Sequence, residues 1–283
     1  MPLRLACLPS RTPFHDNTAR EAAMSKLSVS RTDSRVSPSS ATRPTVLVTG
    51  GSRGIGRAIC LEFGRAGWRV GVHYRERKDD AARTAATVTA DGGEGISYQA
   101  DIGNARQVEA MVQEFVSRWG RFDVLVCNAG QATNGLVLRL RPDEWRAMIE
   151  TNLTGTFHCL KAAASHMLAQ GDGSVIVVSS FAGLQGRPGQ SAYAASKAGL
   201  LGLVKTAARE WGCRNVRVNA VLPGWHRTEL SAPALPGLAG MEDHVLGRSP
   251  DLHAVARSVY HLALLKDVSG QVWNLDSRLI ASV

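Results

Sequence analysis

The sequence lacks the features that define several classes of protein. No apolar run approaches the roughly 18 residues that a transmembrane helix needs, so we expect no membrane span. The five cysteines are odd in number and include no CxxC pair, which argues against a disulfide framework and against a zinc or other metal site. Basic residues are not interleaved with aromatic ones, so nothing points to nucleic acid. These absences favour a cytoplasmic protein with reduced thiols.

The composition is that of a folded, mildly basic protein. Hydrophobic residues make up 44% of the 283 residues, which is enough for the core of one large α/β domain. The net charge is +9, and the first 44 residues contribute seven Lys/Arg against three Asp/Glu. The remaining surplus suits an anionic cofactor or an acidic partner, although it is equally compatible with no charged partner. We expect Cys127 and Cys159 to be small core residues.

Residues 1–44 differ from the rest of the chain. They are rich in Ser, Arg, Thr and Pro and show no apolar periodicity. Three interpretations stay open: a disordered extension, an organelle transit peptide of similar composition, and translated upstream sequence with Met24 as the start. No apolar core followed by a small-residue cleavage site is present, so a secretory signal is not expected.

From residue 45 to residue 283, short β-branched runs alternate with helical patterns. This alternation predicts right-handed βαβ units and a parallel sheet covered by helices on both faces. The sequence therefore predicts one doubly wound Rossmann domain with a seven-stranded sheet. The predicted strands are residues 45–49, 69–74, 96–100, 122–128, 174–180, 216–223 and 271–275.

The first strand runs directly into a glycine-rich loop, TGGSRGIG, at residues 49–56. Between a strand and a helix, such a loop places a dinucleotide pyrophosphate on the helix N-terminus, and glycine allows the backbone to approach closely. An ordinary glycine-rich turn is the alternative. The predicted cofactor-binding residues of this loop are Gly50, Ser52, Arg53, Gly54, Ile55 and Gly56.

The end of the second strand indicates which dinucleotide is bound. An acidic residue there would accept hydrogen bonds from the ribose 2′-hydroxyl of NAD. This chain has Tyr74 and Arg75 instead, and Arg53 lies in the glycine loop. Guanidinium groups at this place suit a 2′-phosphate, which favours NADP(H) over NAD(H). The alternative is that Arg75 and Arg77 are solvated surface residues.

Tyr193 and Lys197 are four residues apart, so both side chains emerge on the same face of a helix. A free phenol has a pKa of about 10, and bringing it to about 7 needs roughly 4 kcal/mol of differential stabilisation. A neighbouring ammonium group supplies stabilisation of this kind. The same spacing also arises by chance, so the pair alone does not establish chemistry.

The motifs TGGSRGIG, CNAG at 127–130 and YAASK at 193–197 follow one another as in the short-chain dehydrogenase/reductase family, which the chain resembles from about residue 45 onward. The resemblance implies a catalytic group of Asn152, Ser180, Tyr193 and Lys197. Tyr193 would protonate the carbonyl oxygen, Ser180 would hold that oxygen, and Lys197 would lower the tyrosine pKa and bind the nicotinamide ribose. Asn152 would hold a water that resupplies the proton. Ser179 is the alternative serine, in the wrong register.

The resemblance also implies cofactor contacts beyond the glycine loop. These residues are Asp101, Ile102, Asn128, Ala129, Gly130, Tyr193, Lys197, Pro223, Gly224 and Thr228. Residues 224–250, rich in Pro and Gly, are expected to form a mobile lid over the substrate. Trp225, His226 and Leu230 are candidates for its pocket, with ordinary packing as the alternative.

Within the family, the chain most resembles the 3-oxoacyl-[acyl-carrier-protein] reductases of fatty acid biosynthesis. This implies reduction of 3-oxoacyl thioesters, an acyl carrier protein as partner, and a homodimer or homotetramer formed through helices at about 142–170 and 192–212. Two features depart from the pattern. Arg214 occupies one expected basic docking position but Gly171 the other, and NLDSRL replaces an Asp-Gly-Gly ending that normally lies at a subunit interface.

Two other functions stay open. The chain could act on another small ketone or alcohol, such as a sugar, polyol or steroid-like compound. A cofactor-binding scaffold without turnover is the third alternative, and the intact set of four catalytic residue types argues against it.

Overall fold

The computed structural model describes residues 43–226 and 244–280. Seven strands form one sheet in the order β3-β2-β1-β4-β5-β6-β7, and every neighbouring pair is parallel. The predicted fold class and all seven predicted strands are therefore confirmed, with ends that move by a few residues. The strands are β1 Thr45–Val48, β2 Arg69–Tyr74, β3 Glu94–Gln99, β4 Val124–Cys127, β5 Gly173–Val178, β6 Val216–Leu222 and β7 Val272–Asn274.

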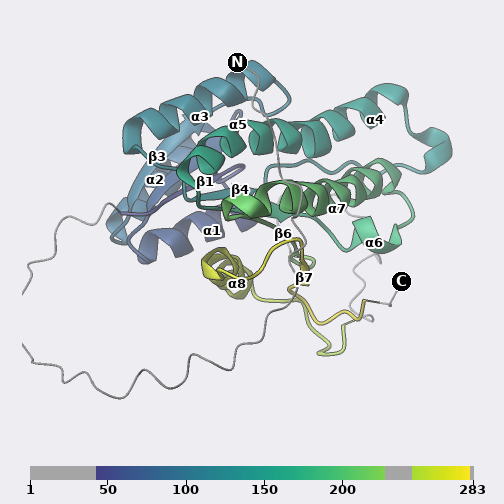
Figure 1. Cartoon of the computed structure of the whole chain (residues 1–283). Helices are drawn as coiled ribbons and strands as arrows, with labels where there is room; N and C mark the ends of the chain where they lie inside the picture. Colours follow the sequence, from purple (N-terminus) through teal and green to yellow (C-terminus); the bar gives the residue numbers. More distant parts are fainter. Residues whose placement is uncertain (1–42, 227–243, 281–283) are drawn as a thin grey trace, which may run out of the picture. The chain divides into compact units, whose positions relative to one another are not determined.

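Helices cover both faces of this sheet (Figure 1). One face packs against α3, α5 and α7, and the other against α1, α2 and α8. The central strands β1, β4, β5 and β6 are buried at every residue, as expected for a parallel sheet covered twice. The helices are α1 Gly54–Arg65, α2 Lys78–Ala90, α3 Ala105–Trp119, α4 Pro142–Ile149, α5 Gly155–Gln170, α6 Ala182–Gln185, α7 Ser191–Trp211 and α8 Leu252–Leu264.

The helix predicted at about 142–170 contains an irregularity that the sequence did not reveal. Its two α-helical parts, α4 and α5, are joined by a π-helical segment, η2, at Glu150–Thr154. A π-helical segment widens one turn and often marks a functional position. Asn152 lies in the middle of it.

Cys127 and Cys159 belong to the core cluster beneath α3, α5 and α7, as expected. Cys60 is also a buried free thiol, and Cys213 is an exposed one. Within residues 43–226 and 244–280, no helix is both long enough and apolar enough to cross a membrane.

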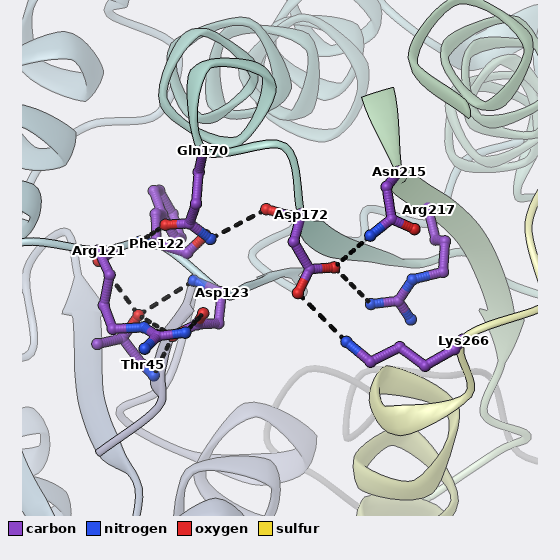
Figure 2. A network of polar contacts seen from close by, with 9 residues as sticks. All are labelled: Thr45, Arg121, Phe122, Asp123, Gln170, Asp172, Asn215, Arg217 and Lys266. Carbon is purple, nitrogen blue, oxygen red and sulfur yellow. Dashed lines mark hydrogen bonds and ion pairs between the residues drawn. The ribbon is translucent and has the colours of Figure 1, made fainter. Parts of the chain in front are cut away.

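The edge of the sheet where the strands begin is closed by a polar network (Figure 2). Asp123, just before β4, accepts hydrogen bonds from the Thr45 backbone N–H at 2.8 Å and from the Arg121 Nε at 2.7 Å. The Thr45 hydroxyl also donates to Asp123, at 3.0 Å. This carboxylate therefore ties the beginning of β1 to the beginning of β4.

Asp172 does the same for the next strands (Figure 2). Its carboxylate accepts from the Asn215 side chain and from the Lys266 ammonium, each at 3.2 Å, and lies 3.8 Å from the Arg217 guanidinium. Arg217 is itself buried, at the start of β6. Charged groups at this edge thus find their partners within the protein, which indicates a structural role.

Candidate active site

Two adjoining cavities at the opposite edge, where the strands end, contain most of the predicted site residues. The first has a volume of about 380 Å³ and lies where the strand order reverses, between β1 and β4. In doubly wound sheets, ligands bind at this switch point. The predicted cofactor residues that line it are Gly50, Ser52, Arg53, Gly54, Ile55, Tyr74, Arg75, Asp101, Ile102, Asn128, Ala129 and Gly130.

Gly56 does not line the cavity but explains how the loop can form. A Cβ at this position would collide with the carbonyl oxygen of Gly50, so α1 could not begin this close to the loop. Gly50 itself has φ +65°, a backbone conformation that favours glycine. The Asn128 side chain donates to the carbonyl oxygens of Thr49 at 3.0 Å and Gly50 at 3.1 Å, fixing the loop from the end of β4.

His73 supports the same loop, and the sequence analysis missed it. The Gly50 backbone N–H donates to Nδ1 of His73 at 3.0 Å, so Nε2 carries the hydrogen and donates to the Ala100 carbonyl at 2.9 Å. Burial lowers the pKa of His73 to about 4, although its contact with Ala100 and the charge of Asp101 oppose this shift. The imidazole is therefore neutral near pH 7. Its only sequence signal is a histidine in an otherwise apolar strand.

The end of the first cavity next to β2 is rich in guanidinium groups. Arg53, Arg75 and Arg77 all line it, and so does Glu76, which was not predicted. The Glu76 carboxylate lies 2.8 Å from the Arg75 guanidinium. Arg53 and Arg75, predicted to bind the cofactor, thus both line the first cavity, accompanied by one acid.

The second cavity, of about 180 Å³, adjoins the first, and Ile55, Asn128 and Gly130 line both. Ser180, two residues after β5, lines it, and so do Tyr193 and Lys197, on the first turns of α7. The structure therefore brings these three predicted catalytic residues together beside the first cavity.

The two neighbouring serines have different surroundings. Ser180 makes a hydrogen bond with the Tyr193 phenol. Ser179 is buried, and its hydroxyl donates to the Lys197 backbone carbonyl at 2.9 Å. Ser179 thus fastens β5 to α7, while Ser180 is the serine that accompanies the tyrosine.

The ionisation of Tyr193 differs from the expectation. Burial raises the pKa of Tyr193 above its ordinary value, and the hydrogen bond with Ser180 offsets this only in part. The predicted lowering of this pKa by Lys197 is not seen. The ammonium lies 5.7 Å from the centre of the tyrosine ring and donates to the Val178 carbonyl at 2.8 Å. Tyr193 is consequently a protonated phenol near pH 7, the form that can donate a proton.

Lys197 is itself perturbed. Burial lowers its pKa to about 8, against the opposing influence of Cys127. An ammonium with a pKa this close to neutrality can exchange a proton in either direction, which is typical of groups in active sites.

Asn152 is fully buried, and its side chain is bonded within the protein. Oδ1 accepts from the Gln131 backbone N–H at 2.8 Å, while Nδ2 lies 2.9 Å from the Gln131 carbonyl and 3.1 Å from the Ser196 hydroxyl. The side chain therefore joins the segment after β4 to α7. The Asn152 backbone carbonyl accepts a hydrogen bond from the Thr156 hydroxyl at 2.9 Å. Water binding by Asn152 stays a prediction.

The far wall of the second cavity comes from the end of β6 and from the C-terminal segment. Pro223 and Gly224, predicted as cofactor contacts, line it, and so do Trp225 and His226, the candidates for the substrate pocket. Burial lowers the pKa of His226, which lies 2.8 Å from the Pro223 carbonyl. Thr228 and Leu230 lie outside the described residues. Arg187 and Arg278 also line this cavity, and neither was predicted.

Comparison with known proteins agrees with this site. Residues 44–238 match the family model described as short chain dehydrogenase. A 3-oxoacyl-[acyl-carrier-protein] reductase from Synechocystis sp. is 37% identical over 241 residues, covering 84% of this chain and 98% of that protein. The reductase FabG of Staphylococcus aureus is 44% identical over 181 residues, covering 64% of this chain and 74% of that protein.

A solved structure agrees in fold. The crystal structure of a dehydrogenase/reductase from Sinorhizobium meliloti superposes with a TM-score of 0.78 at 32% sequence identity, over 83% of this chain and 94% of that one. The sheet order, the glycine loop and the family match lead to one conclusion. The chain belongs to the short-chain dehydrogenase/reductase family and is an oxidoreductase that acts on CH–OH groups.

Proposed function

We propose that this oxidoreductase reduces the 3-keto group of 3-oxoacyl thioesters and that it uses NADPH. The observation that carries the proposal is the placement of Ser180 and Tyr193 in a cavity that adjoins the dinucleotide cavity. The relatives named as 3-oxoacyl-[acyl-carrier-protein] reductases supply the substrate class.

The first cavity fits a nicotinamide dinucleotide. A Cβ on Gly50 would lie 2.9 Å from the Ala129 Cα, so only glycine lets the loop lie this close to the segment after β4. The loop leads into the N-terminus of α1, where a pyrophosphate would be bound. Gly50, Ser52, Arg53 and Ile55 would hold the pyrophosphate, and Lys197 would contact the nicotinamide ribose. When bound, the nicotinamide supplies the hydride; the protein supplies orientation and proton transfer.

Each catalytic side chain has a role that its surroundings support. The protonated phenol of Tyr193 donates a proton to the substrate carbonyl oxygen, on which negative charge develops. The Ser180 hydroxyl, beside the phenol, donates a hydrogen bond to the same oxygen and stabilises that charge. The Lys197 ammonium, with its lowered pKa, is the source from which the phenol regains a proton.

The preference for NADPH is proposed from charge. Three guanidinium groups, those of Arg53, Arg75 and Arg77, line the adenosine end, and Glu76 is paired with Arg75. A 2′-phosphate would find charge-assisted donors there. We expect kcat/KM to be at least about tenfold higher with NADPH than with NADH, and Arg53→Ala to reduce this ratio. Equal efficiency with both cofactors would contradict the assignment.

We also propose that the acyl substrate is bound to an acyl carrier protein, and this proposal rests on one basic residue. Arg214 is exposed, and its guanidinium donates to the Leu168 carbonyl at 3.1 Å, so it presents a fixed charge. Gly171, which ends α5 with φ +74°, offers no second charge. The test compares the same acyl group carried by an acyl carrier protein and by coenzyme A. If the carrier protein docks on Arg214, the KM is lower for the carrier-protein substrate, and Arg214→Ala raises that KM.

We propose that the protein assembles into a dimer or tetramer through α4–α5 and α7. Trp145 and Phe157, on α4 and α5, are 41% and 45% exposed, which leaves aromatic surface for another subunit to cover. Light scattering at micromolar concentration tests this, and a monomer there would contradict it.

The decisive assay for the reaction compares substrates on the purified full chain. Initial rates of NADPH oxidation are measured with acetoacetyl-coenzyme A and with free ketones, sugars and steroid-like ketones. The proposal predicts clear turnover of the thioester, with formation of the 3-hydroxyacyl product. Turnover of a free ketone without turnover of the thioester would assign the enzyme to another substrate class within the same family.

A further inference from the structure

The ending that departs from the family pattern places a guanidinium group in the substrate cavity. Arg278 follows β7 in the segment NLDSRL and lines the same cavity as Ser180 and Tyr193. Its side chain is only 6% exposed, although arginine is seldom buried without a partner. The burial of this charged side chain therefore has to be explained by its partners.

Arg278 is held rigidly by two neighbours. Its Nε donates to the Asp276 carboxylate at 2.7 Å, and its Nη2 contacts the same carboxylate oxygen. The guanidinium carbon lies 4.1 Å from the centre of the Phe181 ring, in stacking distance. Phe181 directly follows Ser180, so the stacked guanidinium is anchored to the residue next to the catalytic serine.

The backbone of this segment is fixed as well. Arg278 pairs with His244 in an isolated antiparallel bridge, and the Val245 backbone N–H donates to the Ser277 carbonyl at 3.1 Å. Asp276 packs against the turn at Gly224, where an added Cβ would lie 3.0 Å from the Asp276 carboxylate. The segment is thereby joined to residues 244–245 and to the turn at Gly224, which lines the cavity.

The Asp276–Arg278 pair leaves donor capacity for a ligand. The carboxylate of Asp276 occupies Nε and Nη2, and Nη1 makes no hydrogen bond to any residue of the described chain. Among the described residues that line this cavity there is no carboxylate, while Arg187 and Lys197 are basic. Because Asp276 offsets much of its charge, Arg278 is best suited to act as a fixed donor to an oxygen atom.

We propose that Arg278 is a specificity-determining residue that donates from Nη1 to the acyl oxygen of the substrate while Ser180 and Tyr193 bind the ketone oxygen. A 3-oxoacyl group carries two carbonyl groups separated by one methylene, so a site with two sets of donors matches it. The acyl oxygen belongs to a thioester if the proposed function is right, and to a carboxylate if the substrate is a free 3-oxo acid. The role of Arg278 as a donor to a thioester oxygen therefore rests on the proposed function.

The test compares substrates with and without that oxygen. We would measure kcat/KM of wild type and Arg278→Gln with acetoacetyl-N-acetylcysteamine, acetoacetate and butanone, which lacks the acyl oxygen. Loss of a hydrogen bond from a charged donor predicts a decrease of about 10- to 100-fold for the preferred acyl substrate. We expect a change within about twofold for butanone. Equal losses on all three substrates would overturn the proposal.

Two further variants separate recognition from folding. Arg278→Gln leaves the buried Asp276 without its partner, so Asp276→Asn/Arg278→Gln removes both charges and is expected to show the same selective loss. Arg248→Gln removes an exposed arginine outside the cavity and should leave kcat/KM unchanged for all three substrates. A double variant that folds and keeps wild-type efficiency on the acyl substrates would refute the role of Arg278.

The wild-type data also distinguish this inference from the proposed function. Reduction of acetoacetate without reduction of the thioester would overturn the proposed function. It would support Arg278 as a hydrogen-bond donor to the substrate carboxylate. A wild-type enzyme that reduces butanone as efficiently as both acyl substrates would overturn the inference directly, whatever the variants show.

Discussion

The two edges of the sheet use buried polar groups in opposite ways. Where the strands begin, Asp123 and Asp172 are surrounded by donors from several strands, and these contacts close the edge (Figure 2). Where the strands end, Ser180, Tyr193 and Lys197 line a cavity. Polar groups at the first edge stabilise the fold, whereas those at the second keep donor capacity and perturbed pKa values for a ligand.

The edge where the strands end is called the catalytic edge below. The neighbouring serines Ser179 and Ser180 give the sharpest test of the difference between the two edges. Ser180→Ala removes a donor to the developing charge, so we expect kcat to decrease by about 10²- to 10³-fold with little change in thermal stability. Ser179→Ala is the matched control and removes a buried contact to α7. We expect it to lower the free energy of unfolding by about 1 kcal/mol and to leave kcat within about tenfold. The reverse order of effects would show that Ser179 is the catalytic serine.

The opposite edge should respond in stability alone. Asp123→Ala leaves the Thr45 N–H and the Arg121 guanidinium without their shared acceptor, so we expect a loss of about 2 kcal/mol in the free energy of unfolding. Chemical denaturation measures this loss. The folded fraction should keep its wild-type kcat, and a decrease in kcat comparable with that of Ser180→Ala would break the comparison between the edges.

His73 belongs to the catalytic edge but acts through the glycine loop. His73→Ala removes the acceptor of the Gly50 N–H, so the loop loses the contact that fixes its conformation. We expect the Kd for NADPH to rise about tenfold while kcat at saturating cofactor changes little. Fluorescence titration of NADPH measures this. A Kd that stays at the wild-type value would assign His73 a purely structural role.

His73 also predicts a pH dependence of stability. Its pKa falls from the ordinary 6.5 to about 4 in the folded chain. Between these two values, His73 is protonated in the unfolded chain but neutral in the folded chain. The stabilisation is complete above pH 6.5 and is lost as the pH falls towards 4. Denaturation midpoints of wild type and His73→Asn should therefore converge with decreasing pH. A constant difference between them across this range would contradict the assignment.

Lys197 predicts the smallest effect near neutral pH. With a pKa of about 8, the ammonium loses its proton as the pH rises through 8. We expect kcat/KM for reduction to be nearly flat below that value and to fall up to tenfold per pH unit above it. A profile that stays flat well above pH 8 would show that this proton is not used.

Much of this organisation could be predicted from the sequence. Parallel strands buried on both faces are almost continuously apolar, which is why runs such as that of β1 were predicted almost correctly. The glycine loop was predictable because Gly50 and Gly56 meet demands that no other residue meets. Tyr193 and Lys197 were paired by their helical spacing, whereas Ser180 was predicted from the resemblance to the family.

The parts that could not be predicted depend on contacts between distant segments. His73 forms hydrogen bonds with Gly50, in the loop after β1, and with Ala100, after β3. No local sequence pattern predicts these contacts. The direction of the Tyr193 pKa shift depends on how completely the ring is buried. Arg278 was visible only as a departure from a pattern, and its contact with Phe181 exists only in the folded chain.

The central claim is that Tyr193 is the proton donor of an NADPH-dependent reduction at the catalytic edge. The direct test is the rate of NADPH oxidation with acetoacetyl-coenzyme A by wild type and Tyr193→Phe, with the Kd for NADPH measured on both. The account predicts a decrease of at least about 10²-fold in kcat with an unchanged Kd and an unchanged thermal midpoint. A Tyr193→Phe enzyme that turns over at the wild-type rate would contradict it.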